Sequence, residues 1–433
     1  MSGTFKRRTH STLKLRRYEP PSFRHFTLTR CDGLAGAVTI STGSAQVGSS
    51  ALNEVQVDEP TVSRFHCEVG VGPGGAWVKD LGSANGTEVD GVRVKEAHLK
   101  DGCVLTLGQV ALRFSLSGDV SPRPQSSEEA FGPLLGAGAV MRACFAQLER
   151  AAETSRPVLL EGETGTGKSA AAEAIHDASA RKDEPFLTVD CAALTPGDLE
   201  AMLFGSDSPR RLSVFEEARE GTVLLDEVGE LSAEHQNRLT TVLERGELRR
   251  TGGGASVLLR CRLLATSRVD LRQWVNETRF RNNLFFRLAV VRVVMPPLRQ
   301  HPEDIPVLVD DYLEAKALTE VEAAPLCTDE FQQRLQASSW QGNVRELHNH
   351  LERCLVMGAA LPLHDTVPPS RAGHVNPRRS WAEARRLALE QFERDYLEAL
   401  LRLHRGKVAE AAKAAEVDRV YVYKLLKKYG LKS

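Results

Sequence analysis

The sequence predicts a multidomain chain with three parts of different fold class: an all-β sandwich, a central α/β domain and an all-α end. Short apolar segments separated by turn residues fill residues 22–118, as in a sandwich of short strands. A glycine-rich turn between an apolar strand and a helix marks the centre. Apolar residues at helical spacing, followed by a basic run, occupy residues 380–433.

Length and composition agree with this organisation. The 433 residues are enough for roughly two or three hydrophobic cores. The net charge is −1 at pH 7, so positive charge is a local feature of the C-terminal end and of the first residues. The eight cysteines occur singly, which argues against a zinc site or a disulfide framework. We see no apolar run of membrane-spanning length and no signal peptide, and therefore expect a cytoplasmic protein without membrane contact.

The central glycine turn has the pattern of a phosphate-binding loop. Residues 162–169 read GETGTGKS, after the apolar run Val158–Leu160 and before a helix expected over Ala170–Ala178. The glycines let successive backbone N–H groups point at a β-phosphate, and the helix N-terminus adds partial positive charge. Lys168 would then lie along the β- and γ-phosphates, and the Ser169 hydroxyl would bind Mg²⁺. The alternative is a glycine loop that fits this short pattern by chance.

A second acidic motif follows at the distance that such a site requires. The apolar segment that starts at Thr222 ends in Asp226 and Glu227. Asp226 would hold Mg²⁺ together with Ser169, and Glu227 would polarise the attacking water. Read alone, the segment is a strand that ends at an acidic turn. Together with the glycine loop it predicts a nucleotide site, whose residues would be Gly162, Glu163, Thr164, Gly165, Thr166, Gly167, Lys168, Ser169 and Asp226.

Two further segments resemble a known family. Residues 280–288 (FRNNLFFRL) and 340–347 (WQGNVREL) resemble the FREDLYYRL and WPGNVREL segments of bacterial enhancer-binding proteins, the sigma-54-dependent AAA+ transcription activators. The resemblance covers about residues 132–368 and implies an α/β AAA+ P-loop NTPase with an α-helical lid that uses ATP and Mg²⁺.

The same resemblance assigns roles to arginines. It implies that Arg281 and Arg287 are arginine fingers that reach the γ-phosphate of a neighbouring subunit, and that Arg345 senses the nucleotide of its own subunit. With Glu227 these are the expected catalytic residues. A site shared in this way implies a homo-oligomeric ring. For each arginine taken singly, the alternative is a surface salt bridge.

The chain departs from the family pattern where the family contacts sigma-54. After residues 203–205 the family continues through a GAFTGA loop whose tip presses on sigma-54, but here residues 206–214 read SDSPRRLSV and the tip is absent. Three smaller departures are Asp190 for asparagine, Ser267-Arg268 for the sensor Thr-Asn, and Gln341 for proline. Together they argue against normal coupling to sigma-54, while the groups needed to bind ATP remain.

The N-terminal strands resemble a phosphopeptide reader. Gly48, residues 62–66 (VSRFH) and residues 81–87 (LGSANGT) resemble, in this order, three motifs of the forkhead-associated (FHA) domain, which reads phosphothreonine. The resemblance implies that Ser63 and Arg64 contact the phosphate.

It also implies that His66 braces the loop and that Asn85 holds the backbone of the ligand. Two family contacts are missing, since Ser49 stands where arginine is usual and Ala84 where serine or threonine is usual. The alternative is a phosphate-independent protein contact.

The C-terminal segment resembles a Fis-type helix-turn-helix. Apolar residues from Leu389 to Leu403 recur at spacings of three and four, and residues 408–430 have the pattern of two helices joined by a turn. Glu416 stands where the turn commonly has glycine. The expected DNA contacts are Arg419, Tyr421, Lys424, Lys427 and Lys428. The alternative is a solvated basic helix.

The sequence therefore predicts a sigma-54-dependent-type transcription regulator with an FHA-like domain (22–118), an AAA+ domain (132–368) and a helix-turn-helix domain (380–433), with linkers at 117–129 and 368–379. Its expected partners are DNA at an enhancer-like or operator site, a phosphothreonine protein and further copies of the chain. The family implies sigma-54 RNA polymerase as a partner, and the missing tip argues against it. The alternative is a non-remodelling DNA-binding repressor or scaffold that uses ATP only as a structural switch.

Overall fold

The computed structural model describes residues 22–363, except 35, 73, 123, 208–209, 251 and 253–255, and in addition Val408 and Leu426. The chain divides into two compact units, Met1–Pro362 and Leu363–Ser433. The predicted helix-turn-helix, with its expected DNA contacts Arg419, Tyr421, Lys424, Lys427 and Lys428, lies in the second unit and outside the described residues.

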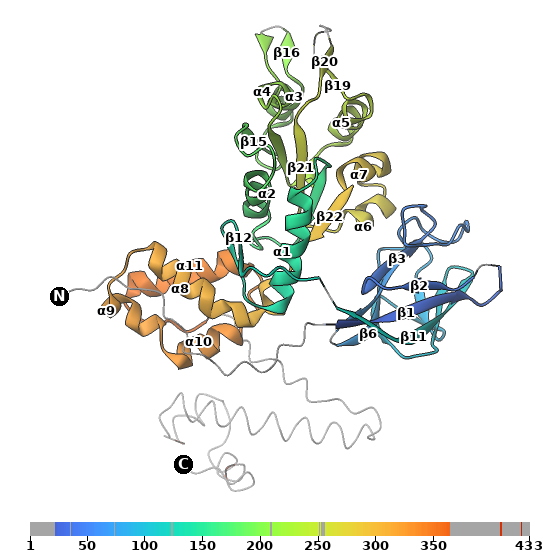
Figure 1. The fold of residues 1–433 in the computed structure, drawn as a ribbon, viewed down its shortest axis with the longest axis horizontal. Helices are drawn as coiled ribbons and strands as arrows, with labels where there is room; N and C mark the ends of the chain where they lie inside the picture. The colour runs from blue at the N-terminus through green and yellow to red at the C-terminus, as the bar shows by residue number, and fades with distance from the viewer. Residues whose placement is uncertain are drawn as a thin grey trace. The chain divides into compact units, whose positions relative to one another are not determined.

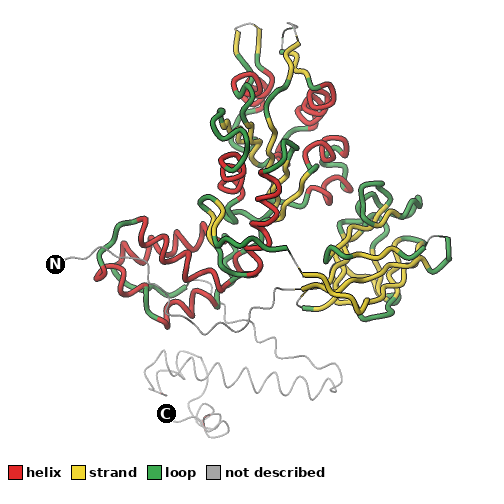
Figure 2. Tube along the Cα trace, viewed as in Figure 1, coloured by secondary structure: helices red, strands yellow, loops and turns green. Residues whose placement is uncertain are grey.

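The N-terminal part is a sandwich of two sheets, drawn almost entirely as strands and loops in Figure 2. One sheet has the order β2-β1-β11-β10-β7-β8 and the other β4-β3-β5-β6-β9. The strands are β1 (Ser22–Arg30), β2 (Val38–Ile40), β3 (Ser44–Gly48), β4 (Val55–Gln56), β5 (Cys67–Gly72), β6 (Gly75–Asp80), β7 (Thr87–Val89), β8 (Val92–Val94), β9 (Glu96–Leu99), β10 (Val104–Leu107) and β11 (Val110–Pro122). In β10 the buried residues are Leu105 and Leu107, the alternation expected of a strand with one face on a core. The predicted all-β class is confirmed.

One predicted boundary is wrong. The Ser- and Pro-rich stretch from residue 117 predicts a linker, but β11 continues to Pro122. The reason is that β11 pairs with β1, at the start of the domain, from Ser22↔Pro122 to Arg30↔Leu112. Backbone hydrogen bonding to β1 therefore outweighs the local turn propensity of these residues.

The central part is built on a parallel five-stranded sheet in the order β15-β18-β21-β14-β22. These strands are β14 (Val158–Glu161), β15 (Phe186–Asp190), β18 (Thr222–Asp226), β21 (Arg262–Ser267) and β22 (Val291–Val294). Leu159 belongs to one hydrophobic cluster and Val158 and Leu160 to another, so both faces of the sheet are covered, as parallel sheets require. Because parallel strands end at the same edge, the segments after β14, β18 and β21 meet there.

Helices and 3₁₀ turns surround this sheet (Figure 1). They are α1 (Ala139–Ala152), α2 (Lys168–Asp177), α3 (Pro196–Phe204), α4 (Val214–Glu217), η1 (Val228–Glu230), α5 (Ala233–Arg245), α6 (Leu271–Asn276) and α7 (Asn282–Leu288). The helix predicted to start at Ala170 starts at Lys168, with Gly167 as its N-cap. The lysine and the serine of the motif thus lie in the first turn of α2, where the helix dipole favours bound anions.

Three short hairpins accompany the sheet. They are β12 (Ala130–Phe131) with β13 (Leu134–Leu135), β16 (Ser206–Asp207) with β17 (Arg210–Arg211), and β19 (Glu247–Arg249) with β20 (Ser256–Leu258). Figure 1 shows the last two at the same end of the domain. The β16–β17 hairpin is the structure of the segment in which the sequence lacks the GAFTGA tip.

The helical lid follows, as predicted, and Figure 2 shows it without long strands. Its elements are η2 (Leu298–Gln300), η3 (Pro302–Asp304), α8 (Ile305–Ala315), α9 (Glu320–Ala323), η4 (Ala324–Leu326), α10 (Asp329–Gln336) and α11 (Asn343–Met357). Trp340 is buried before α11, and its indole N–H donates to the Leu335 carbonyl at 2.7 Å. Within the described part of the chain, no helix has both the length and the apolar character needed to cross a membrane.

Candidate functional site

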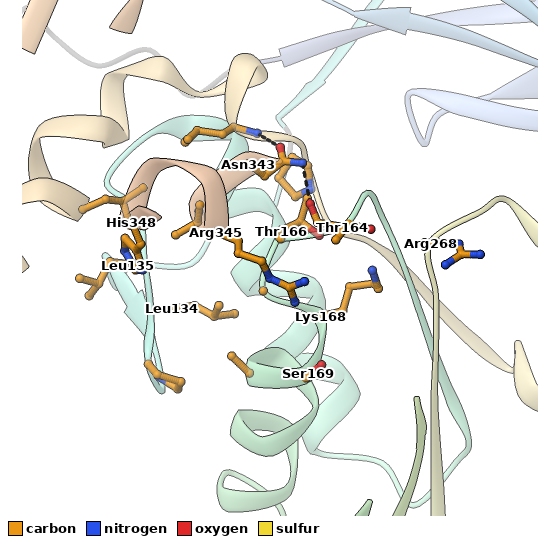
Figure 3. A pocket seen from close by; sticks show the side chains of 18 of the residues that line it. Leu134, Leu135, Thr164, Thr166, Lys168, Ser169, Arg268, Asn343, Arg345 and His348 are labelled. Atoms are coloured by element: carbon orange, nitrogen blue, oxygen red, sulfur yellow. Dashed lines mark hydrogen bonds between the residues drawn. The ribbon is translucent and has the colours of Figure 1, made fainter. Parts of the chain in front are cut away.

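A cavity of about 530 Å³ opens where the strand ends, the glycine loop and the lid meet. Its lining includes residues 164–170 of the loop and α2, Asp226 and Glu227 after β18, and residues 343–345 at the start of α11. Figure 3 shows Lys168 from α2 and Arg345 from α11 extending into the same space. The volume lies in the range of small-molecule sites, and the sequence motifs predicted for a nucleotide are thus brought together.

The glycine loop adopts the backbone that its sequence requires. Gly165 has a φ of +83°, and a Cβ there would lie 2.2 Å from the Gly342 carbonyl oxygen of the lid, so only glycine fits. The Lys168 ammonium donates to the carbonyl oxygens of Gly162 at 2.9 Å and Glu163 at 3.3 Å. Lys168 is 6% exposed. Its charge is therefore held at the cavity by the loop itself.

Ser169 and Asp226 form an oxygen-rich corner that suits Mg²⁺. The Ser169 hydroxyl donates to Asp226 Oδ2 at 3.3 Å, and the Thr266 hydroxyl donates to Asp226 Oδ1. Mg²⁺ binds one or two protein oxygens and keeps several water or phosphate ligands, so this donor set fits the ion. Among the described residues there is no group of three or more His, Cys, Asp or Glu that could hold a metal ion.

Glu227 is held in position by three neighbours. Its backbone lies in the left-handed region (φ +54°) and its N–H donates to Thr266 Oγ1 at 2.8 Å. One carboxylate oxygen lies 3.3 Å from the Lys168 ammonium, and the other accepts from the Arg268 N–H at 2.9 Å. The carboxylate is therefore fixed at the cavity, as an orienting group for water must be.

Arg268, at the position of the family's sensor asparagine, contacts Glu227 through its backbone. Its guanidinium pairs instead with Glu230 at 2.5 Å, and the residue lines the cavity. Thr266 bonds to both Asp226 and Glu227, yet no motif in the sequence identifies it. Only its place in β21, next to β18, makes it part of the site.

Asn343 fastens the lid to the glycine loop. Its side-chain oxygen accepts from the Leu298 N–H at 2.8 Å, and its amide donates to the Thr164 carbonyl at 3.0 Å (Figure 3). The amide also donates to Glu163 Oε2 at 3.2 Å. The next N–H, of Val344, donates to the Gly165 carbonyl at 3.1 Å. Since α11 begins on the loop, Arg345 is delivered to the cavity.

The Glu163 side chain serves the same attachment. Arg299 of η2 donates to both of its carboxylate oxygens, at 2.7 and 2.6 Å. These hydrogen bonds lower the pKa of Glu163 and raise the pKa of Arg299. Gly162 and Glu163, predicted to bind the nucleotide, do not line the cavity. They hold Lys168 and the lid, while residues 164–169 and Asp226 line it.

Arg281 and Arg287 lie outside this cavity. Arg281 precedes α7 and is exposed, and its N–H donates to Gln236 Oε1 at 2.9 Å. The Arg287 guanidinium lies 3.4 Å from a carboxylate oxygen of Glu244 in α5, and both side chains are about 40% exposed. In these positions neither arginine contributes to the lining of the cavity in its own subunit.

The three residues predicted to bind a phosphopeptide gather on two neighbouring loops of the sandwich. The Ser63 hydroxyl accepts from the Ala84 N–H at 2.9 Å, and the Asn85 amide donates to the Thr61 carbonyl at 2.7 Å. Arg64, which directly follows Ser63, is exposed. The loops that contain residues 61–64 and 83–85 are thus tied together, and Arg64 and Asn85 are exposed on them.

Two buried polar residues brace these loops. His66 accepts from the Ser63 N–H at its Nδ1 and donates from Nε2 to the Gly86 carbonyl at 3.0 Å, and burial lowers its pKa. Asp80 accepts from the hydroxyl groups of Ser83 and Thr87. Burial alone would raise the pKa of Asp80, but these hydrogen bonds outweigh it and lower the pKa. The sequence predicted the bracing role of His66 and missed that of Asp80.

Comparisons with known families agree with this geometry. The model of the Sigma-54 interaction domain matches residues 134–294, that of the FHA domain residues 45–108, and that of the AAA+ ATPase lid domain residues 299–368. The predicted combination of an all-β FHA domain and an α/β AAA+ domain with a helical lid is confirmed.

Curated relatives are transcription regulators. The C4-dicarboxylate transport transcriptional regulatory protein DctD of Pseudomonas aeruginosa is 35% identical over 311 residues, which are 70% of this chain and 65% of that protein. The transcriptional regulatory protein ZraR of Salmonella typhimurium is 33% identical over 313 residues, 68% of each protein. This chain therefore spans just under two thirds of DctD.

Solved structures are also similar to this chain. NtrX from Brucella abortus in complex with ATP has 32% identity and a TM-score of 0.49, over 70% of each chain. A structure from a study of phosphothreonine-dependent FHA domain interactions has 30% identity and a TM-score of 0.21, over 22% of this chain and 97% of that one.

The attachment of the lid by Asn343 leads to a first prediction. Asn343→Ala removes the three hydrogen bonds to residues 163, 164 and 298, leaves buried groups unpaired at about 1–3 kcal/mol, and weakens binding of a fluorescent ATP analogue roughly tenfold or more. Asn343→Gly gives the same loss without the strain of a left-handed alanine, since φ is +54°. Asn349→Ala, on the exposed side of α11, is the matched control. Unchanged affinity in both Asn343 variants would contradict the role.

Proposed function

Since this chain belongs to the family of transcriptional regulators that contain the Sigma-54 interaction domain, we propose that it binds Mg·ATP and DNA and controls transcription in response to a phosphothreonine protein. The observation that supports the ATP part most directly is the meeting of Lys168, Asp226, Glu227 and Arg345 around one cavity. These residues come from the start of α2, the end of β18 and the lid, and together supply the charges that a triphosphate requires.

Each group has a distinct role in this proposal. Ser169 and Asp226 would hold Mg²⁺, which neutralises charge on the β- and γ-phosphates when bound. The Lys168 ammonium, now bonded to loop carbonyl oxygens, would turn to the phosphates. Glu227 would orient the attacking water, and Arg345 would report the γ-phosphate to the lid. At the other side of the cavity, Leu134 and Leu135 offer an apolar wall for the base.

The remaining charges would come from a neighbouring copy. The positions of Arg281 and Arg287 outside the cavity support arginine fingers that act in trans. A guanidinium is suited to the charge that develops on the transferred phosphoryl group. We therefore propose a homo-oligomeric ring in which Arg281 and Arg287 complete the site of the next subunit.

The segment between α3 and α4 supports a second candidate function. Its β16–β17 hairpin pairs Ser206 with Arg211 and Asp207 with Arg210, and Ser213 then caps α4 through a capping box with Glu216. The chain therefore passes from α3 to α4 without room for a long protruding tip. We propose that this protein does not press on sigma-54 in the manner of the family, and that a DNA-binding repressor or scaffold with ATP as a structural switch is the alternative.

The DNA-binding proposal rests on the sequence alone. Arg419, Tyr421, Lys424, Lys427 and Lys428 would contact an enhancer-like or operator site, with phosphate contacts that weaken as salt increases. A regulator with these partners would act in the cytoplasm.

The FHA part of the proposal rests on Ser63, Arg64 and Asn85. A phosphate group has nearly two negative charges and several acceptor oxygens, so a hydroxyl, a guanidinium and an amide on adjoining loops suit it. The exposure of Arg64 and Asn85 supports access for a peptide. A phosphate-independent contact is the alternative that binding measurements separate.

We expect two substitutions to impair the proposed ATP site in distinguishable ways. Lys168→Ala removes the ammonium from the phosphates and lowers ATP turnover by about 10²-fold or more. Glu227→Gln keeps ATP binding but lowers turnover by roughly 10²-fold or more, because the water-orienting carboxylate is lost while Lys168 and Asp226 remain. Turnover is measured by phosphate release from the full chain, and Lys182→Ala, exposed after α2, is the matched control.

Two results would count against this assignment. Wild-type protein that binds Mg·ATP without turning it over, at any concentration, would favour the structural switch. Turnover that persists in Lys168→Ala would place the activity outside this cavity.

The phosphopeptide site gives a third prediction. Arg64→Ala removes a charge-assisted hydrogen bond worth about 1.5–3 kcal/mol, so affinity for a phosphothreonine peptide library falls roughly tenfold or more. Binding of the phosphorylated and plain libraries to the full chain is compared by fluorescence anisotropy. Arg113→Ala on β11 is an exposed arginine control. Equal affinity of wild-type protein for the two libraries would refute phosphothreonine reading.

Transcription in vitro tests the contact with sigma-54. Because the β16–β17 hairpin is short, we expect no protein-dependent open complexes by sigma-54 RNA polymerase on a supercoiled sigma-54 promoter, even with ATP. A characterised activator on the same template is the positive control. Open complexes that require this protein and hydrolysable ATP would refute the inference from the hairpin.

A further inference from the structure

The last residue of α6 bonds to both peptide-binding loops of the FHA domain. Asn276 donates from its side-chain amide to the carbonyl oxygens of Phe65 at 2.5 Å and Leu81 at 2.9 Å. Its side-chain oxygen accepts from the Phe65 N–H at 3.4 Å. Phe65 directly follows Arg64, and Leu81 precedes the loop with Asn85. One side chain of the AAA+ domain thus bridges the two loops that would hold a phosphopeptide.

Phe65 packs against the AAA+ domain. Its ring centroid lies 5.2 Å from that of Phe285 and 6.0 Å from that of Phe286, both in α7. Phe65 is 1% exposed and Leu81 is fully buried, and both belong to the hydrophobic cluster of the AAA+ sheet and helices. Burial of a phenylalanine side chain contributes about 1.5–3 kcal/mol. Phe65 therefore anchors the FHA domain to an apolar surface of the AAA+ domain.

A chain of ion pairs runs from the FHA domain to the glycine loop. Arg272 of α6 is 2% exposed and contacts Glu68 of β5 at 2.8 Å and Asp270 at 2.6 Å. Arg292 lies 3.6 Å from Asp270 and also pairs with Glu161, the residue before the glycine loop. A buried charge is costly when a partner is removed, so these groups depend on one another.

We propose that the FHA domain docks on α6 and α7 of its own chain through Phe65, Asn276 and the Glu68–Arg272 pair, and that this docked state binds the phosphopeptide more tightly than the undocked state. The peptide part rests on the proposed function of the FHA domain. Arg64 and Asn85 stay exposed while Asn276 fixes the spacing of their loops, so docking removes part of the cost of ordering them.

The coupling is reciprocal. A ligand that binds the docked state more tightly stabilises docking by the same factor. The surface that receives Phe65 is α7, which follows Arg281 and contains Arg287. Phosphopeptide binding would therefore hold in place the helix proposed to serve the neighbouring subunit.

A disulfide tests docking without any ligand. A Cβ added at Gly82 would lie 4.0 Å from Gln273 Cβ, within the range of disulfides. The Gly82→Cys/Gln273→Cys variant of the full chain should therefore form an intramolecular cross-link on mild oxidation, detected by peptide mapping. Each single variant, and Gly82→Cys with Glu244→Cys, should not. Absence of the cross-link, or only intermolecular cross-links, would overturn docking.

Hydrogen exchange gives a second readout that needs no cysteine at Gly82, where φ is +72°. We expect amide exchange of residues 64–66 to become faster in Asn276→Ala than in wild-type protein, while Asn237→Ala on the exposed side of α5 leaves it unchanged. Equal exchange in all three proteins would overturn docking.

The affinity for a phosphothreonine peptide library tests the coupling. We expect Asn276→Ala to lower the affinity of the full chain about fivefold, the lower end of ordinary coupling between sites, and Asn237→Ala to leave it unchanged. Combining Asn276→Ala with the oxidised Gly82→Cys/Gln273→Cys cross-link should restore the affinity for the library. Wild-type binding that Asn276→Ala does not weaken would overturn the coupling. If wild-type protein does not bind the library, the coupling falls with the FHA proposal, and the cross-link and exchange still decide docking.

Discussion

The tightest constraint at the cavity is the contact between the backbones of the glycine loop and the lid. Gly165 of the loop lies against the carbonyl of Gly342, which directly precedes α11, and no side chain fits between them. Asn343 bonds to the loop immediately after this contact. The shape of the glycine loop and the position of the start of α11 are therefore coupled. A movement of the loop therefore also moves the start of α11, and with it Arg345.

Charged residues at the end of β14, directly before the glycine loop, also constrain it. Glu161 ends β14 and is buried, and burial raises its pKa although the nearby Arg292 opposes this. Its carboxylate accepts hydrogen bonds from Arg292 and from the Leu271 N–H at the start of α6. The loop is thus fixed on one side to the lid and on the other to α6.

The sequence predicted the parts of the site that are contiguous motifs, and missed residues whose roles depend on contacts with distant segments. The glycine loop and the strand that ends in Asp226 were predictable because each motif is contiguous and has its own periodicity. Thr266 and Asn276 were not, because their roles depend on which segments lie beside them, and polar residues of these types are common on any surface. The same reason explains the wrong linker boundary, since only pairing with β1 makes residues up to Pro122 a strand.

Helix α6 shows why distant contacts matter here. It has six residues, too few for a helix to be stable in water by itself, so its structure depends on tertiary contacts. At its start Asp270 caps the Arg272 N–H and pairs with the Arg272 guanidinium, and at its end Asn276 bonds to the FHA loops. A helix of this length is marginal by itself, so loss of the contacts at either end weakens the whole helix. Helix α6, which joins the FHA domain to the strand before the glycine loop, therefore depends on its contacts at both ends.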